Sequence, residues 1–541
     1  MRYQKPLRWI EMLDDLSSVE FLLSIQYAGR DFYFSTQPRV LLDERNEPIQ
    51  YLGGLDIKWS DALNLFNESP SLLAVSMALF FPVDVAELVA RGHELWRATG
   101  ELSLWIEGRP WEDRFVLVRG SVVDPSYGAK NQSVKFSLES NGFQDRALTH
   151  PPTQTVTRTN WPLADDGAIG LYYPIVFGRP GVYQDSNGTD VSTKGSPALV
   201  VNDGTLGTSK AIIAGHEVEA QNVTVWNVSA DPPVSAVRPV TLETDILGQS
   251  VSTVDALIAN VNYSDGDSLF VSWNLDGGGL WNDRRNGNRT GAGELITYFL
   301  RLSTLEIDRG LWRSAETYLN QNFKFSGFLD TAVQPWKYIQ QNFLPLIPVS
   351  VYATAEGISC WVWKKDAERS AAIGTIDAGG GVCRSGVVQY EQQTIVNDMR
   401  LSFALDANEN KFQRSVGVVG DREPNPETER DLFSTEYSRA SFYRFGPAAT
   451  VFESNVVYDQ ATAINILQWK HRVQAFPYRV IEYDVPIRLG FLRRGDLVLI
   501  NDPELYLNEE LAFVRDVVWS DGKPTLSFVL TDDPPRDDHS S

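Results

Sequence analysis

Short runs in which apolar and polar residues alternate recur along most of this sequence, separated by glycine, proline, asparagine and aspartate. The first two are VEFLLSIQY and DFYFST, within residues 19–36, and Gly29 lies between them. Successive side chains of a strand point to opposite faces of a sheet, so each run predicts a strand with one buried face. Glycine between two such runs favours a hairpin turn. A chain built from these runs must pair them into sheets or barrels, and we expect a mainly β fold with α+β segments.

The length of the chain requires several hydrophobic cores. At roughly 100 to 200 residues per domain, 541 residues predict three or four domains. We expect a first β-barrel domain over residues 1–150, with three strands between 102 and 140 and one helix that follows Pro82. Three prolines between 149 and 166 then predict a linker.

The middle of the chain predicts two inserted modules. Residues 165–245 carry β-type runs such as YYPIVFG, KAIIAG and NVTVWNV between turn-forming residues, so a small all-β module is expected there. Residues 246–345 change to a helical period, with helices expected over 294–303 and 314–321 and a third that begins at Pro335. Proline suits a first helical turn, because the nitrogen at that position has no acceptor within the helix. This second module is expected to be α/β.

Strands return in residues 346–535, which we expect to form a second barrel domain. VSVYAT and ISCWVWK predict a hairpin, and a helix is expected over 458–474. The stretch 417–445 is polar and charged and contains DREPNPETER, a composition typical of a surface excursion.

Charge and the lack of long apolar stretches argue against a nucleic-acid-binding protein and against an exported or membrane-spanning one. With 70 acidic and 48 basic residues, the formal net charge of -22 would repel a phosphate backbone, and no dense run of lysine and arginine opposes it. The start of the chain has no apolar signal-peptide core, and no stretch of about 18 apolar residues could span a membrane. Simple solubility is a sufficient reason for the acidity.

No local motif for catalysis is present. The sequence has no G-x-S-x-G elbow, no H-E-x-x-H helix and no phosphate-binding loop. It leaves open a pair of carboxylates across a cleft, as in glycosidases, because 70 acids are available. We therefore expect no catalytic, cofactor-binding or metal-binding residues and no enzymatic activity. The histidines are scattered along the chain, at His93, His150, His216, His471 and His539.

Three further groups of residues have structural interpretations. Asp265-Gly266-Asp267 and the glycine-rich stretch 275–279 resemble fragments of calcium loops, but they lack the full ligand spacing and are better read as turns. The tryptophans within 273–281 and 361–363 suit core packing or a subunit interface better than glycan stacking. Whether Cys360 and Cys383 approach closely enough for a disulfide is not fixed by the sequence.

The C-terminal region carries an ordered set of motifs across about 80 residues. Gly495 permits a tight turn, Asp496 can accept hydrogen bonds from local amides, and Leu497 returns the chain to the sheet. In order, the motifs are DQATA (459–463), PYR (477–479), LRRGDLV (492–498), NDPEL (501–505), FVRDV (513–517) and DG (521–522). This order resembles the closing domain of bacteriophage tail hub, or baseplate hub, proteins, in which a helix precedes strands, a glycine-aspartate turn, a short loop and a final hairpin.

The resemblance implies a fold and an assembly. Hubs of this family carry two tail-tube-like β-barrel domains with inserted modules between them, and they form a trimeric ring on the tube axis. The barrels would correspond here to residues 1–150 and 346–535, with inserted β and α/β modules between. LYYPIVFG (171–178) also resembles an inserted β module of some tail-tip proteins.

The resemblance also implies a function. The chain would be a structural virion protein that connects the tail tube to the distal tip or spike and lines the DNA ejection channel, where acidic walls would not bind passing DNA. Its partners would be further copies of itself in a homotrimer, the tail tube or distal tail protein, the tip, spike or peripheral baseplate proteins, the tape measure protein, and phage DNA only in transit. It would assemble in the host cytoplasm, where both thiols stay reduced. The alternative is a host-glycan-binding or carbohydrate-active tail protein.

Overall fold

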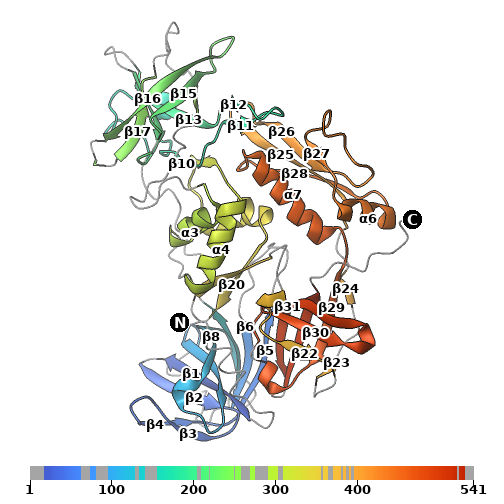
Figure 1. The fold of residues 1–541 in the computed structure, drawn as a ribbon. Helices are drawn as coiled ribbons and strands as arrows, with labels where there is room; N and C mark the ends of the chain where they lie inside the picture. The colour runs from blue at the N-terminus through green and yellow to red at the C-terminus, as the bar shows by residue number, and fades with distance from the viewer. Residues whose placement is uncertain are drawn as a thin grey trace.

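The structure is a computed structural model. It describes residues 18–27, 29–62, 74–80, 95–127, 133–140, 155–203, 209–218, 220–245, 247–248, 250–256, 268–273, 290–302, 307, 309–354, 357–363, 369–378, 382–384, 389–391, 395–490, 492–520 and 523–530. The helix expected after Pro82 lies outside these residues. The fold is mainly β with α+β segments arranged in several units, as the sequence predicted (Figure 1).

One large sheet combines the two ends of the chain. Its 14 strands come from both termini and follow the order β2-β1-β7-β8-β9-β6-β5-β31-β32-β29-β23, with β30 beside β31, β24 beside β29 and β22 beside β30. The N-terminal strands are β1 (Val19–Tyr27), β2 (Arg30–Ser35), β5 (Leu55–Ala62), β6 (Ala74–Phe80), β7 (Thr99–Ile106), β8 (Phe115–Tyr127) and β9 (Ser133–Ser140). The C-terminal strands are β22 (Thr375–Asp377), β23 (Cys383–Arg384), β24 (Gln389–Glu391), β29 (Tyr478–Asp484), β30 (Leu497–Asp502), β31 (Leu507–Ser520) and β32 (Lys523–Leu530).

The alternating pattern accounts for the first hairpin of this sheet. β1 and β2 pair antiparallel with Tyr27 opposite Arg30, and Gly29 in the turn has a φ of 74°, which glycine adopts without strain. Leu23 and Ile25 are buried in a core that also contains Phe528 of the last strand. The predicted hairpin is confirmed, and the two ends of the sequence share one hydrophobic core.

A closed six-stranded barrel forms the inserted all-β module. Its strands follow the order β13-β14-β17-β16-β15-β18, and valine and alanine dominate its core. They are β13 (Ser196–Asp203), β14 (Ser209–Ala214), β15 (Asn222–Asn227), β16 (Val234–Thr244), β17 (Ser250–Val254) and β18 (Leu269–Ser272). Two short strands precede the barrel, β11 (Val182–Gln184) and β12 (Asp190–Ser192). The barrel extends beyond the expected limit at residue 245, because β17 and β18 are needed to close it.

The α/β module follows the barrel. The three expected helices are present as α3 (Ala292–Leu302), α4 (Arg309–Asn322) and α5 (Pro335–Asn342), and the expected hairpin is β20 (Val349–Thr354) with β21 (Gly357–Val362). The module also contains β19 (Gly327–Leu329), which pairs with β10 (Ile175–Phe177) of the YYPIVFG run. Phe177 packs edge-on against Phe299 and Phe343 in the core of the α/β module, whereas Val176 of the same run is buried in the core of the barrel, so this run contributes to both modules.

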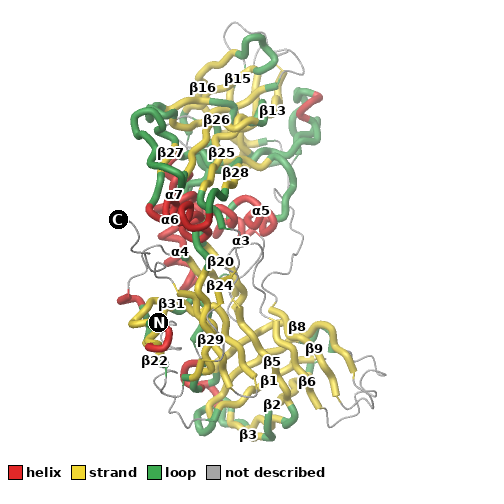
Figure 2. Tube along the Cα trace, turned by 90° about the vertical axis from the view of Figure 1, so that its right-hand side faces the viewer, coloured by secondary structure: helices red, strands yellow, loops and turns green. Residues whose placement is uncertain are grey.

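A further sheet-and-helix unit lies within the expected second barrel. It is formed by β25 (Asp398–Asp406), β26 (Lys411–Val418), β27 (Leu432–Phe433), α6 (Glu436–Phe445), β28 (Ala449–Glu453) and α7 (Gln460–Gln474). Its strands have the order β27-β26-β25-β28 and belong to no other sheet. The segment 417–445, expected as a surface excursion of a single barrel over 346–535, therefore includes a strand and a capped helix of this separate unit. Figures 1 and 2 show this unit near the small barrel, at the opposite end of the molecule from the large sheet.

Within the described residues, no helix is long and apolar enough to cross a membrane.

Candidate assembly interface

The seam between β5 and β31 joins the two terminal sets of strands. Val518 lies opposite Ser60 and Trp519 opposite Trp59 in an antiparallel ladder. Trp519 is buried, and its ring meets Phe21 of β1 edge-on at a centroid distance of 6.0 Å. Strands more than 450 residues apart in sequence thus share both backbone pairing and a tryptophan anchor. Figure 1 shows the blue and red strand sets side by side.

The predicted glycine-aspartate turn leads into β30. The amide of Arg493 donates to Asp496 Oδ2 at 2.7 Å, and the Asp496 amide donates back to the Arg493 carbonyl at 3.0 Å. The local hydrogen bond predicted for Asp496 is confirmed. Although Asp496 is only half-buried, desolvation by the surrounding protein raises the pKa of its carboxyl to about 6. The hydrogen bond that the carboxylate accepts from the Arg493 amide opposes this rise.

Gly495 is required in this turn for two reasons. Its φ is 83°, in the left-handed region, and a Cβ there would lie 2.3 Å from Cδ1 of Trp361. Trp361 is itself packed against Phe513 of β31, with ring centroids 4.5 Å apart. The turn, the β20–β21 hairpin and the long strand β31 therefore fit together closely. Trp361 and Trp363 pack against the core, in agreement with the expectation of core packing over glycan stacking.

A second rigid turn connects β30 to β31. The Asp502 carboxylate is fully buried and accepts hydrogen bonds from the Tyr483 hydroxyl at 2.7 Å and from the amides of Glu504 and Leu505. Tyr506, at the end of this turn, has a φ of 56°, and 94% of it is exposed. Sequence reasoning missed Tyr506, because an aromatic residue in a strand-like context predicts burial.

The ends of the large sheet are covered or short. β23 has two residues, while β22 and β24 have three each. At the other end, Leu52 exchanges backbone hydrogen bonds with Tyr33 and Ser35 of β2, so the hairpin that follows β2 covers part of that edge. Short and covered edges oppose sheet extension between molecules. Contacts between copies at these ends would therefore use side chains.

The hairpin beside β2 offers such side chains. It consists of β3 (Arg39–Leu42) and β4 (Pro48–Tyr51). Val40 and Leu42 are 66% and 54% exposed and lie on one face of β3, since alternate strand residues share a face. On the other face, Arg39 is held by Glu20 at 2.6 Å and Glu107 at 2.9 Å. The hairpin is thus anchored on one side and presents two aliphatic residues on the other.

The remaining sequence candidates do not form a reactive site among the described residues. No cluster of histidine, cysteine and acidic side chains there could hold a metal ion. Trp273 is fully buried and donates to Ser196 Oγ at 3.0 Å, and the side chain of Cys360 is buried. Asp265-Gly266-Asp267, the stretch 275–279 and the side chain of Cys383 lie outside the described residues.

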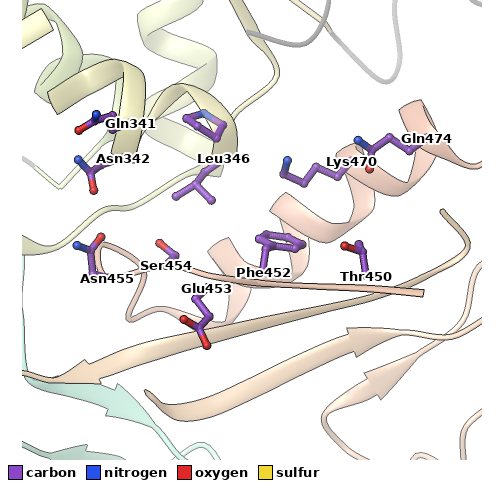
Figure 3. A pocket seen from close by; sticks show the side chains of 11 residues that line it. Gln341, Asn342, Leu346, Thr450, Phe452, Glu453, Ser454, Asn455, Lys470 and Gln474 are labelled. Carbon is purple, nitrogen blue, oxygen red and sulfur yellow. The ribbon is translucent and has the colours of Figure 1, made fainter. Parts of the chain in front are cut away.

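A cleft between the α/β module and the sheet-and-helix unit of β25–β28, α6 and α7, called the smaller sheet unit below, was not foreseen. It has a volume of about 280 Å³ and lies between α5, α7 and β28 (Figure 3). Its lining is mostly polar, with amides, hydroxyls and one lysine beside one aromatic ring. The lining residues are Gln341, Asn342, Pro345, Leu346, Thr450, Phe452, Glu453, Ser454, Asn455, Lys470 and Gln474. A lysine on a helix resembles an ordinary solvated residue in the sequence, so no local signal distinguished this one.

Comparison with known proteins gives matches among solved structures. No protein-family model and no curated protein matches the chain. The 43 kDa tail protein of prophage MuSo2 from Shewanella oneidensis is 8% identical, with coverage of 94% of this chain and 98% of that one and a TM-score of 0.38. The tail protein from Neisseria meningitidis MC58 is 8% identical, with coverage of 94% and 96% and a TM-score of 0.36. The prophage tail protein gp18 from Listeria monocytogenes EGD-e is 9% identical, with coverage of 95% and 94% and a TM-score of 0.31. Over nearly its whole length, this chain is similar to solved tail proteins from three bacteria.

Proposed function

We propose that this chain is a non-enzymatic structural protein of a phage tail, a ring-forming hub that joins the tail tube to the distal tip or spike. The observation that carries the proposal is the shared sheet. Strands from the two ends of the chain pair along the β5–β31 seam and share one core, although three other units lie between them in sequence. A protein whose N-terminal and C-terminal strands lie side by side in one sheet can supply two consecutive segments of a tube wall from each copy.

The proposed ring is a homotrimer whose large sheets surround the channel. Because the ends of the sheet are short or covered, the copies meet through side chains, and Val40 and Leu42 on β3 are the proposed apolar contact. The barrel and the smaller sheet unit lie at the other end of the molecule, where they are available to peripheral tail proteins (Figure 2). The tail tube, the tip and the tape measure protein are the proposed axial partners, with DNA only in transit.

The proposal is tested by the mass of the assembly in solution. Sedimentation velocity of the purified chain is expected to show a trimer, and Val40→Lys with Leu42→Glu is expected to shift it to monomer without loss of folded structure. Val237→Lys is the matched control, because Val237 is 60% exposed on β16 of the barrel, away from the large sheet. A monomer at all concentrations, or equal dissociation by the control, would contradict the proposed contact. Cleavage of peptidoglycan by the purified chain would favour the enzymatic alternative instead.

A further inference from the structure

The outer strand of the smaller sheet, β28, has an open edge. β28 pairs in parallel with β25 on one side, and no described residue pairs with it on the other. The Ala448 carbonyl accepts from Asp398, and the Ser454 amide donates to the Ser402 carbonyl. Since backbone groups of alternate strand residues point to opposite sides, those of Ala449, Val451 and Glu453 point away from β25. Three exposed residues thus present unpaired amides and carbonyls along one edge.

The cleft beside this edge contains a lysine, Lys470, whose ammonium contacts only aromatic rings among the described side chains. Among the described residues, Lys470 forms no ion pair and no hydrogen bond, and its ammonium lies 5.2 Å from the ring of Phe452 and 5.3 Å from that of Trp469. Burial lowers the pKa of Lys470 to about 8. The one carboxylate that lines the cleft, Glu453, points away from Lys470 (Figure 3). A carboxylate placed in the cleft would pair with this ammonium at a site already partly dehydrated.

The walls of the cleft narrow the choice of ligand. A nucleic acid would require several cations, and the cleft has one. A sugar would require a free aromatic face, but Lys470 already covers the ring of Phe452. Amides and hydroxyls such as Asn342 and Thr450 suit the polar groups of a peptide, and Leu346 offers an apolar contact. An extended peptide satisfies the strand edge, the amides and the lysine together.

We propose that β28 and its cleft bind an extended peptide segment of another protein, which adds to the sheet as a strand and places a carboxylate against Lys470. Alternate side chains of the added strand enter the cleft, so an acidic residue is followed or preceded, two positions away, by an apolar residue near Leu346. The site lies between β28, α7 and α5, far from the proposed ring contact on β3 (Figure 1). A negative result for peptide binding would therefore leave the hub proposal unaffected.

The test begins with random peptides of about ten residues, long enough to pair with all of β28, displayed on yeast and sorted against the full chain. Enriched peptides are expected to carry aspartate or glutamate with an apolar residue two positions away. A synthetic enriched peptide is then measured by fluorescence anisotropy. Lys470→Gln is expected to weaken binding by about tenfold or more, because it removes a charge-assisted contact.

Backbone pairing is tested separately. Val451→Pro removes an outward N–H while the ladder to β25 keeps its own bonds, and it is expected to weaken binding, whereas Val451→Thr should bind as wild type. If the proline variant does not fold, the peptide is N-methylated instead, at one or the other set of alternate residues. Only methylation of the set whose N–H groups face β28 should abolish binding. Enrichment of neutral or basic peptides, equal binding by both N-methylated registers, or absence of any binder would overturn the proposal. Self-association that Val451→Pro abolishes would also overturn it, because the occupant would then be a second copy of this chain.

Discussion

Replacement of Gly495 by alanine tests how closely the C-terminal turn fits against the β20–β21 hairpin. A residue with a Cβ at a φ of 83° costs about 1–2 kcal/mol. The new methyl group would also lie 2.3 Å from Cδ1 of Trp361, whose ring is held by Phe513, and forced displacement in a packed core costs about 1–3 kcal/mol. Together these effects should destabilise the turn and its strands by roughly 2–5 kcal/mol.

Gly29→Ala provides the matched control. Gly29 has a φ of 74°, but a Cβ there meets nothing within 4 Å, so only the backbone cost of about 1–2 kcal/mol applies. Hydrogen exchange reports local opening in a protein with several units, and it should be followed for β30 and β31 in one variant and for β1 and β2 in the other. A Trp361→Leu background should reduce the excess cost of Gly495→Ala. Equal local destabilisation by both substitutions would refute the close contact.

Three other predictions concern pH and buried groups. His471 is 1% exposed, and burial lowers its pKa from 6.5 to about 4, so the folded protein prefers the neutral ring. The free energy of unfolding should therefore keep its full value above about pH 6.5 and fall by on the order of 3 kcal/mol toward pH 4, because the unfolded chain binds a proton that the folded protein does not. His471→Phe should remove this part of the pH dependence in urea titrations at several pH values. Asp502→Ala should cost roughly 2–4 kcal/mol and more than Asp502→Asn, because the Tyr483 hydroxyl and the Glu504 amide lose their acceptor; equal urea midpoints would contradict this. Trp519→Ala should cost about 3–5 kcal/mol and increase hydrogen exchange on both β1 and β32, and an effect confined to β32 would argue against one shared core.

Elements with strong local patterns could be predicted from the sequence. The β1–β2 hairpin, the helices α3, α4, α5 and α7, and the Gly495 turn all carry their signal within a few consecutive residues, as alternation, helical spacing, proline at a first turn, or glycine at positive φ. These predictions are confirmed. In each case the residues that determine the conformation are neighbours in sequence.

Features that depend on distant residues could not be predicted. α6 was missed because its buried residues are Ser438 and Ser441, which give no apolar period, and its capping box of Thr435 with Ser438 stands in a polar stretch. The YYPIVFG run has a clear strand pattern, but its partner β19 lies about 150 residues later. The β5–β31 seam, the open edge of β28 and the position of Lys470 all arise from tertiary packing, which the local alternation of apolar and polar residues does not determine.

The rotational symmetry of the isolated protein in electron micrographs is the most direct test of the proposed function. The account predicts closed threefold rings in which the N-terminal and C-terminal strand sets alternate around a central channel. Single molecules, open filaments, or rings in which the large sheets face outward would contradict it.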